Sequence, residues 1–305
     1  MAYAQTELFV ENNHGDMNLL NKELCIGDVY FVDSTNTLAG DTIYHGKSRE
    51  KPFATLAYAV TQTTTDNGDW VILSPNHAET VAAAGGITIA AAMDGITIAG
   101  ATGRTQDYPT IAFDTSVNAD IEVDGAGTVF KRIRFTNTQD ACVSPFDIDA
   151  AGCEFHSCIF EDLGADNTIH WITADANADD LKLIDCINLG TDTAGNTGFI
   201  TIAAASHIEI RNLQSQGDFS ASNIVFTAAA TDVLIDDCRL ENLNAVDANI
   251  TGFAALTGFI TRCYCHIATD AQVTWVTTPG NTMTGQSFGT NDDGECGLII
   301  GVVSI

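Results

Sequence analysis

Acidic side chains are the residues of this sequence whose number and spacing could support chemistry. Asp and Glu account for 40 of the 305 residues, and the adjacent aspartates include the pairs Asp179-Asp180 and Asp236-Asp237. Two carboxyl groups held about 5–10 Å apart on an exposed face can cleave a glycosidic bond. Neighbours on one strand point to opposite faces of a sheet, so neither pair could act alone. We expect these carboxylates to lie in solvated turns.

The cysteines show no metal or redox motif. No two have the spacing Cys-x-x-Cys, and Cys263 with Cys265 matches no zinc motif. An odd number without a motif is typical of reduced thiols in a chain folded in a cytosol. We expect them to pack in the core as small hydrophobic residues, with metal binding or redox chemistry as the alternative. The nine are Cys25, Cys142, Cys153, Cys158, Cys186, Cys238, Cys263, Cys265 and Cys296.

Motifs for other catalytic chemistry are missing. The sequence has no HExxH, no GxSxG and no phosphate-binding loop. His77 and Glu79 are expected to form a structural hydrogen bond. The acidic run Asn291-Asp292-Asp293-Gly294-Glu295 lacks the ligand spacing of an EF-hand, so a solvated turn is expected there. We therefore predict no catalytic, metal or cofactor site and a chain that is not an enzyme.

The charge restricts the partners. The formal net charge is −28, which repels nucleic acid and anionic membranes, so we expect neither as a partner. Solubility is the simplest explanation of the acidity, and docking onto a basic partner or collecting cations is the alternative. No apolar run approaches the length of a membrane span. The first residues lack the basic and apolar regions of a secretory signal.

The elements that would position these side chains repeat along the chain. Five segments begin with an apolar strand at Phe146, Trp171, Phe199, Ile224 and Phe253. Most continue through an alanine-rich turn into a second apolar strand that ends at Cys or Leu. Strict alternation inside the strands indicates one buried and one exposed face.

The residue at the end of the second strand recurs at a nearly constant interval. The intervals are 25, 28, 27, 25 and 25 residues, along Ile133, Cys158, Cys186, Leu213, Cys238 and Cys263. The preceding residue is always polar, namely Arg132, Ser157, Asp185, Asn212, Asp237 and Arg262. Such a period predicts a solenoid whose coils bury a shared core. A β-propeller would need a period of about 40 residues, and a sandwich would not keep a constant interval.

The same period suggests one candidate pair of carboxylates. Asp185 and Asp237 hold equivalent positions two coils apart. Neighbouring strands lie about 4.8 Å from each other, so the two side chains could share an exposed face. Solvation at the surface is the alternative for both.

The pattern divides the chain into four parts. Residues 1–28 are polar and without a clear period, and are predicted to be an N-terminal arm. Residues 29–84 are a capping region, in which Phe53, Leu56 and Val60 predict a short helix and first strands flank it. Residues 85–270 form the solenoid. Residues 271–305 are predicted to close the last coil or to contact another subunit, because the apolar run 296–305 must be covered.

Residues 29–80 resemble the N-terminal part of pectin-lyase-like β-helix proteins encoded by phages. The resemblance depends on Val29-Tyr30-Phe31-Val32-Asp33, Gly46-Lys47-Ser48, Pro52-Phe53-Ala54-Thr55-Leu56, Gly68-Asp69-Trp70-Val71-Ile72 and Pro75-Asn76-His77-Ala78-Glu79-Thr80. It implies an all-β, single-stranded right-handed parallel β-helix whose first coil is capped by a short helix. The repeat pattern extends it to about residue 270.

With its alanine-rich turns and no large loop insertions, the chain most resembles small β-helix proteins of phage heads. That resemblance implies a non-enzymatic virion protein, a capsid decoration or head-associated protein that binds the major capsid protein or another virion protein. Such proteins are commonly trimers, and this one would be assembled in the host cytoplasm.

The alternative is a tailspike or receptor-binding protein that binds or cleaves host polysaccharide. It predicts exposed aromatic residues beside paired carboxylates, and the candidates are Trp171, Tyr264 and Trp275. Arg132-Ile133-Arg134 resembles the Arg-Ile-Lys motif of polygalacturonases. It precedes both aspartate pairs, however, and Gly-His-Gly is missing, so that activity is not expected.

Overall fold

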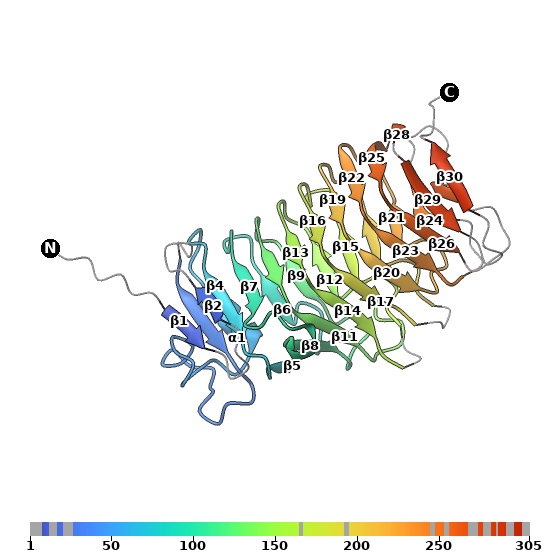
Figure 1. Ribbon diagram of the computed structural model, residues 1–305. Helices are drawn as coiled ribbons and strands as arrows, with labels where there is room; N and C mark the ends of the chain where they lie inside the picture. The colour runs from blue at the N-terminus through green and yellow to red at the C-terminus, as the bar shows by residue number, and fades with distance from the viewer. Residues whose placement is uncertain are drawn as a thin grey trace.

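The chain folds into a right-handed parallel β-helix. The computed structural model describes residues 8–11, 17–20, 27–164, 167–191, 195–244, 248–252, 256–267, 274–276, 282–284, 286–290 and 296–300. Three long sheets run along the stack of coils (Figure 1). No helix in the described part of the chain is long and apolar enough to cross a membrane.

Each sheet collects one strand from every coil. Sheet I consists of β3 (Val29–Val32), β4 (Trp70–Leu73), β7 (Thr97–Gly100), β10 (Val129–Lys131), β13 (Glu154–His156), β16 (Lys182–Ile184), β19 (Glu209–Arg211), β22 (Val233–Asp236), β25 (Thr257–Thr261) and β28 (Thr282–Thr284). Sheet II consists of β5 (Ala78–Thr80), β8 (Thr110–Phe113), β11 (Arg134–Asn137), β14 (Ile159–Asp162), β17 (Ile187–Leu189), β20 (Gln214–Gly217), β23 (Arg239–Asn242), β26 (Tyr264–Ile267), β29 (Gln286–Thr290) and β30 (Cys296–Ile300). Sheet III consists of β6 (Ile87–Ile89), β9 (Ile121–Val123), β12 (Phe146–Ile148), β15 (Ile172–Ala174), β18 (Ile200–Ile202), β21 (Ile224–Phe226), β24 (Ala248–Thr251) and β27 (Thr274–Val276).

The pairing register confirms the predicted period. In sheet I the core residues Phe130, Phe155, Leu183, Ile210, Ile235 and Ile260 are successive partners, so the coils advance by 25, 28, 27, 25 and 25 residues. The sequence pattern predicts two strands per coil, whereas the coils of the structure have three, because sheet II supplies the third. Some sheet II strands, such as Gln214–Gly217, are polar, and an apolar pattern does not detect them.

The recurring polar residue marks a sharp corner between sheets I and II. All six of these residues have a positive φ between 49° and 57°: Arg132, Ser157, Asp185, Asn212, Asp237 and Arg262. The left-handed conformation turns the chain within one residue. The next residue, from Ile133 to Cys263, is buried in each coil. Ile133 therefore belongs to the corner, and the strand expected around it begins at Arg134.

A second corner, between sheets III and I, has the same conformation. Gly68, Gly95, Gly127 and Gly152 have φ between 65° and 73°, and Asp180, His207 and Asp232 replace glycine in later coils with φ of 55° to 60°. Both corners thus repeat along the stack, which fixes the angles between the three sheets.

Aromatic rings fill the middle of the core. Phe130 stacks on Phe155 with centroids 5.0 Å apart, and Phe135 stacks on Phe160 at 5.4 Å. Phe146 meets Phe135 edge to face at 4.7 Å. The two stacked pairs are register partners in neighbouring coils, so side-chain stacking reinforces the backbone pairing.

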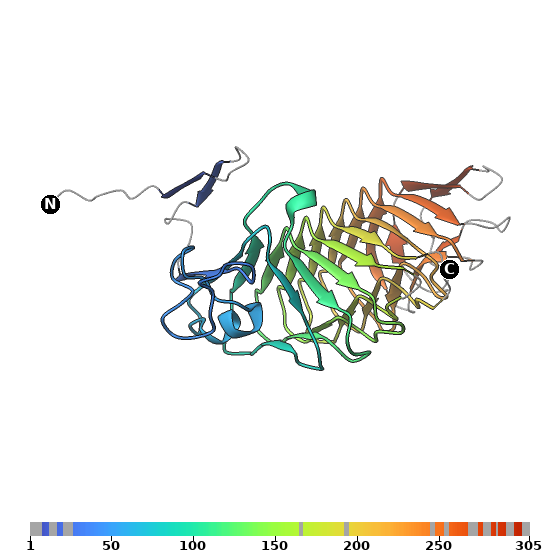
Figure 2. The same ribbon diagram turned by 90° about the horizontal axis from the view of Figure 1, so that it is seen from below.

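The two ends of the stack differ from the coils. The short helix α1 (Leu56–Thr61) and the loop 33–52 lie together at one end (Figure 2). Ahead of them, β1 (Leu8–Glu11) and β2 (Met17–Leu20) form a separate antiparallel hairpin. The arm was expected to lack strands, but its two apolar runs are too short to show a period. At the other end β30 pairs antiparallel with β29, so this part of the run 296–305 extends sheet II, while residues 301–305 lie outside the described residues.

Candidate docking surface at the N-terminal end

The loop 33–52, here called the N-terminal loop, is fixed to the edge of sheet I. Phe31 donates its backbone N–H to the carbonyl of Gly46 at 2.8 Å, and Asp33 donates to the carbonyl of Phe53 at 2.9 Å. Gly46 has a φ of +82°, and a Cβ there would come within 2.0 Å of the Phe53 ring. Glycine is therefore required where the loop crosses this ring.

Asp41 holds the outer part of the N-terminal loop against the start of α1. Its Oδ1 accepts hydrogen bonds from the backbone N–H groups of Ala54 at 2.9 Å and Thr55 at 3.2 Å. Its Oδ2 accepts from Thr55 Oγ1 at 2.9 Å. The segment around Asp41 is therefore held in one conformation although it projects from the protein.

This fixed loop exposes large apolar side chains. Leu38 is 57% exposed, Ile43 74% and Tyr44 83%, and the last two are the most exposed large apolar residues in the described part of the chain. Isolated exposed apolar residues are ordinary, but three within seven residues on an ordered loop are typical of an interaction surface.

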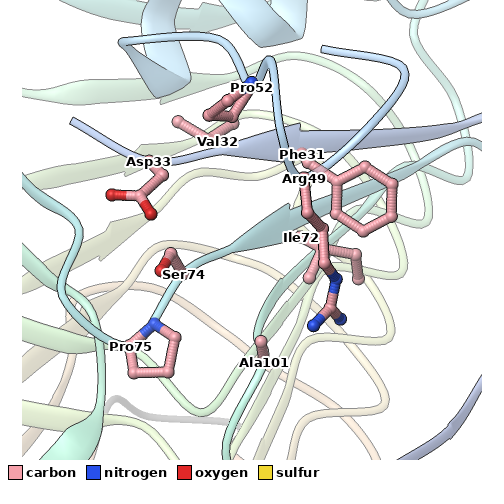
Figure 3. A pocket seen from close by; sticks show the side chains of 9 residues that line it. All are labelled: Phe31, Val32, Asp33, Arg49, Pro52, Ile72, Ser74, Pro75 and Ala101. Carbon is pink, nitrogen blue, oxygen red and sulfur yellow. The ribbon is translucent and has the colours of Figure 1, made fainter. Parts of the chain in front are cut away.

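A small cavity lies between the N-terminal loop and the outer face of sheet I. It measures about 70 Å³. Arg49 and Phe31 lie on one side, and Asp33, Ser74 and Pro75 lie on the other (Figure 3). The guanidinium of Arg49 lies 5.3 Å from the centre of the Phe31 ring. Burial lowers the pKa of Arg49, so this end presents a cation that is partly shielded from water.

His77 and Glu79 complete the support of this end. Glu79 accepts hydrogen bonds from the N–H groups of Leu56 and Ala57, which are the first residues of α1. His77 Nδ1 accepts from the N–H of Ser34 at 3.2 Å, and its Nε2 lies 3.2 Å from Glu79 Oε2. The pair thus links the helix, sheet II and the N-terminal loop, in the structural role expected from the sequence.

The carboxylates singled out in the sequence do not form an acid–base pair. Asp185 and Asp237 lie on exposed corners two coils apart, and Asn212 lies between them and donates to Asp185 at 2.8 Å. Asp179 accepts from the N–H of Ser206 at 2.6 Å. Asp236 was expected in a solvated turn, but it is buried and paired with Arg262.

A closer pair of carboxylates lies on sheet III. Glu122 and Asp147 are outward-facing register partners in neighbouring coils, which lie about 4.8 Å apart. Burial raises the pKa of Asp147, and the negative charges of Asp175, Asp120, Asp149 and Glu122 raise it further. Both residues stand at the centre of alternating strands, so aligning Ile121-Glu122-Val123 with Phe146-Asp147-Ile148 could have paired them.

The candidate aromatic residues are not gathered in a binding cleft. Trp171 is buried against Phe160 and Phe113, and the side chain of Trp275 lies outside the described residues. Tyr264 is partly exposed on sheet II, where the guanidinium of Arg239 lies 5.8 Å from its ring centre. Beside it a shallow groove of about 210 Å³ is lined by Ile187, Asn188, Leu189, Gln214, Ser215, Gln216, Arg239 and Glu241.

Seven of the nine cysteines are described, and all seven are buried free thiols. This agrees with the expected core packing. Burial raises the pKa of Cys142 to about 12, with a further contribution from Asp162. Among the described residues, no group of three or more His, Cys, Asp or Glu side chains is placed to hold a metal ion. The acidic run 291–295 lies outside the described residues.

Comparison with solved structures supports the fold. A structure titled "Rhamnogalacturonan lyase" aligns with a TM-score of 0.50 and 13% identity over 79% of this chain and 74% of that chain. A second, titled "Crystal structure of pectate lyase Pel9A", aligns with a TM-score of 0.45 and 11% identity over 85% and 75%. No protein-family model and no curated protein matches the sequence. The first of these alignments supports the parallel β-helix as the fold of this chain.

Proposed function

We propose that this chain is a non-enzymatic structural protein of a virus particle, which docks by its N-terminal end onto a basic protein surface of that particle. The observation that supports this most is the ordered N-terminal loop with Leu38, Ile43 and Tyr44 exposed to water. A loop already fixed by Asp41 loses little conformational freedom on binding. Tyrosine is among the residues that contribute most to protein interfaces.

The charge of the molecule defines the chemistry of the partner. With a net charge of −28, the chain is attracted to a basic surface and repelled by an acidic one. A shell protein that presents basic residues around an apolar depression would match both the acidity and the three exposed side chains. The resemblance of residues 29–80 to phage β-helix proteins favours a virion as the place of docking.

Ion pairs between coils also favour a structural role. Lys182 bonds Glu154 at 2.7 Å, and Arg134 bonds Glu161 at 2.5 Å. Each pair joins two coils that are neighbours in the stack. Two of the scarce cations therefore link neighbouring coils, although partly exposed pairs of this kind each add little stability.

A binding assay with particles tests the proposal. The double variant Ile43→Ser/Tyr44→Ser should lose at least about tenfold in affinity for particles that lack the protein, because it removes two interface anchors. Phe259→Ser is the matched control, since Phe259 is 61% exposed on a later coil. Cosedimentation measures both. Equal binding by the double variant and the control would contradict docking through the N-terminal loop.

A second candidate function is cleavage of a polysaccharide, and the stacked Glu122 and Asp147 favour it. Their separation suits an acid–base pair, and Asp147 has a raised pKa that would help it to hold a proton. Turnover of host polysaccharide that Asp147→Asn abolishes and Asp185→Asn leaves unchanged would support this function. No turnover by the unmodified protein would exclude it for the polysaccharides assayed.

A further inference from the structure

The ladder at the corner between sheets I and II contains two pairs of stacked cysteines. Asp236 pairs with Thr261 and Arg239 pairs with Tyr264, so Cys238 and Cys263 lie directly above one another. The register of the neighbouring coils likewise stacks Cys158 on Cys186, because His156 pairs with Ile184 and Ile159 with Ile187. Leu213 separates the two pairs.

Stacking in a parallel solenoid brings these thiols to the separation of a disulfide. Paired strands lie about 4.8 Å apart, and the Cα atoms of disulfide-bonded cysteines lie about 4.4–6.8 Å apart. The sulfur of Cys263 accepts a hydrogen bond from the backbone N–H of Cys238 at 3.4 Å. The thiol of Cys263 is thus directed at Cys238, and a side-chain rotation of Cys238 would bring the two sulfurs together.

The electrostatics of the Cys238–Cys263 pair favour reaction at Cys263. The hydrogen bond from the thiol of Cys238 lowers the pKa of Cys263, although burial opposes this. The same interaction and burial raise the pKa of Cys238. One thiol of the pair is therefore the better nucleophile, as in other reactive dithiols. The corner residues Asp237 and Arg262, which precede them in the chain, are exposed, so the pair lies at a corner of the coil that borders solvent.

The geometry points to two oxidation sites, at which Cys238–Cys263 and Cys158–Cys186 close into disulfides that join neighbouring coils. With a low-molecular-weight disulfide as oxidant, one cysteine thiolate attacks a sulfur of the oxidant and releases one thiolate. The second cysteine, as its thiolate, then attacks the mixed disulfide and releases the other. Two cysteine protons end on two small thiols, and two electrons pass to the oxidant.

Each disulfide would close a loop of one coil and restrict the unfolded chain. Loops of 25 and 28 residues separate the paired cysteines. Cross-links over loops of this length stabilise proteins, mainly through the unfolded state. A chain folded with reduced thiols would thus gain stability on entering an oxidising environment, whatever partner it binds.

The experiment oxidises the folded, full-length protein with oxidised glutathione, alkylates the remaining thiols and maps the disulfides by mass spectrometry. The expected products are the Cys238–Cys263 and Cys158–Cys186 links, each with the loss of two hydrogen atoms. The oxidised protein should melt several degrees higher, and a reductant should reverse the shift.

Matched variants locate the sites. Cys263→Ala should remove the first link, whereas Cys265→Ala should leave it intact, because Cys265 stacks on Leu240 and Gly289. For the second pair, Cys186→Ala should remove the link and Cys153→Ala should leave it intact. The map of the unmodified protein decides the matter even if a variant does not fold. Links between other cysteines, glutathione adducts alone, or oxidation only after unfolding would overturn the inference.

Discussion

At the scale of single residues, the coil depends on side chains that tolerate a left-handed backbone. Asn and Asp adopt this conformation more readily than other residues with a side chain, and Asp185, Asn212 and Asp237 follow that preference. Arg132 and Arg262 do not, and each gains a partner in a neighbouring coil: Arg132 Nε donates to the carbonyl of Gly100, and Arg262 pairs with Asp236. Contacts between coils therefore offset the local cost.

A buried carboxylate at the end of β14 makes stability depend on pH. Asp162 accepts hydrogen bonds from Asn137 at 3.2 Å, Asn196 at 3.2 Å and Thr168 N–H at 3.1 Å. Burial nevertheless raises its pKa to about 6. The folded protein thus binds the proton more tightly than the unfolded chain does, so this group stabilises the fold below its unfolded pKa and loses that contribution as pH rises through about 6.

The variant Asp162→Asn tests this pH dependence. The free energy of unfolding of the unmodified protein should rise by about 2 kcal/mol relative to the variant as the pH falls from 7 to 4. Denaturant titrations of both proteins at several pH values measure the difference in the free energy of unfolding. The contributions of the other carboxylates are the same in both proteins and cancel in this difference. A difference that does not change with pH would show that Asp162 does not titrate in this way.

At the scale of elements, α1 depends on a carboxylate from outside the helix. Glu79 accepts hydrogen bonds from the N–H groups of Leu56 and Ala57. These two N–H groups have no acceptor inside the helix. Glu79→Ala should therefore lower the free energy of unfolding by about 1–2 kcal/mol. Glu50→Ala is the control, because Glu50 is exposed. Chemical denaturation measures both, and equal stabilities would contradict a capping role.

The elements also show how far a single sequence predicts this fold. The intervals between Ile133 and Cys263 gave the coil length, because every coil buries one residue at the same corner. Polar strands such as Gln214–Gly217 escaped prediction, since their pairing comes from the coils on either side and not from their own side chains. The pair Glu122 and Asp147 escaped for a related reason: register between coils is a property of the stack. The exposed Ile43 and Tyr44 gave no periodic signal at all.

At the scale of the whole molecule, the acidity should govern association. Attraction between the acidic rod and a basic partner is screened by salt over about 8–10 Å at physiological ionic strength. The affinity for particles should therefore fall as salt is raised, mainly through a slower association rate. Binding kinetics at several salt concentrations measure this effect. An association rate independent of salt would argue against a basic partner and leave apolar contacts as the source of affinity.

The most direct test of the proposed docking is cryo-electron microscopy of the virus particle that is proposed to carry this chain, with mass spectrometry to establish that the protein is present. Docking through the N-terminal loop predicts density for a β-helix in many symmetric copies on the shell, with the N-terminal loop and the α1 end against the shell protein. Absence of the chain from the particle, or a β-helix attached through its opposite end, would contradict docking through the N-terminal loop.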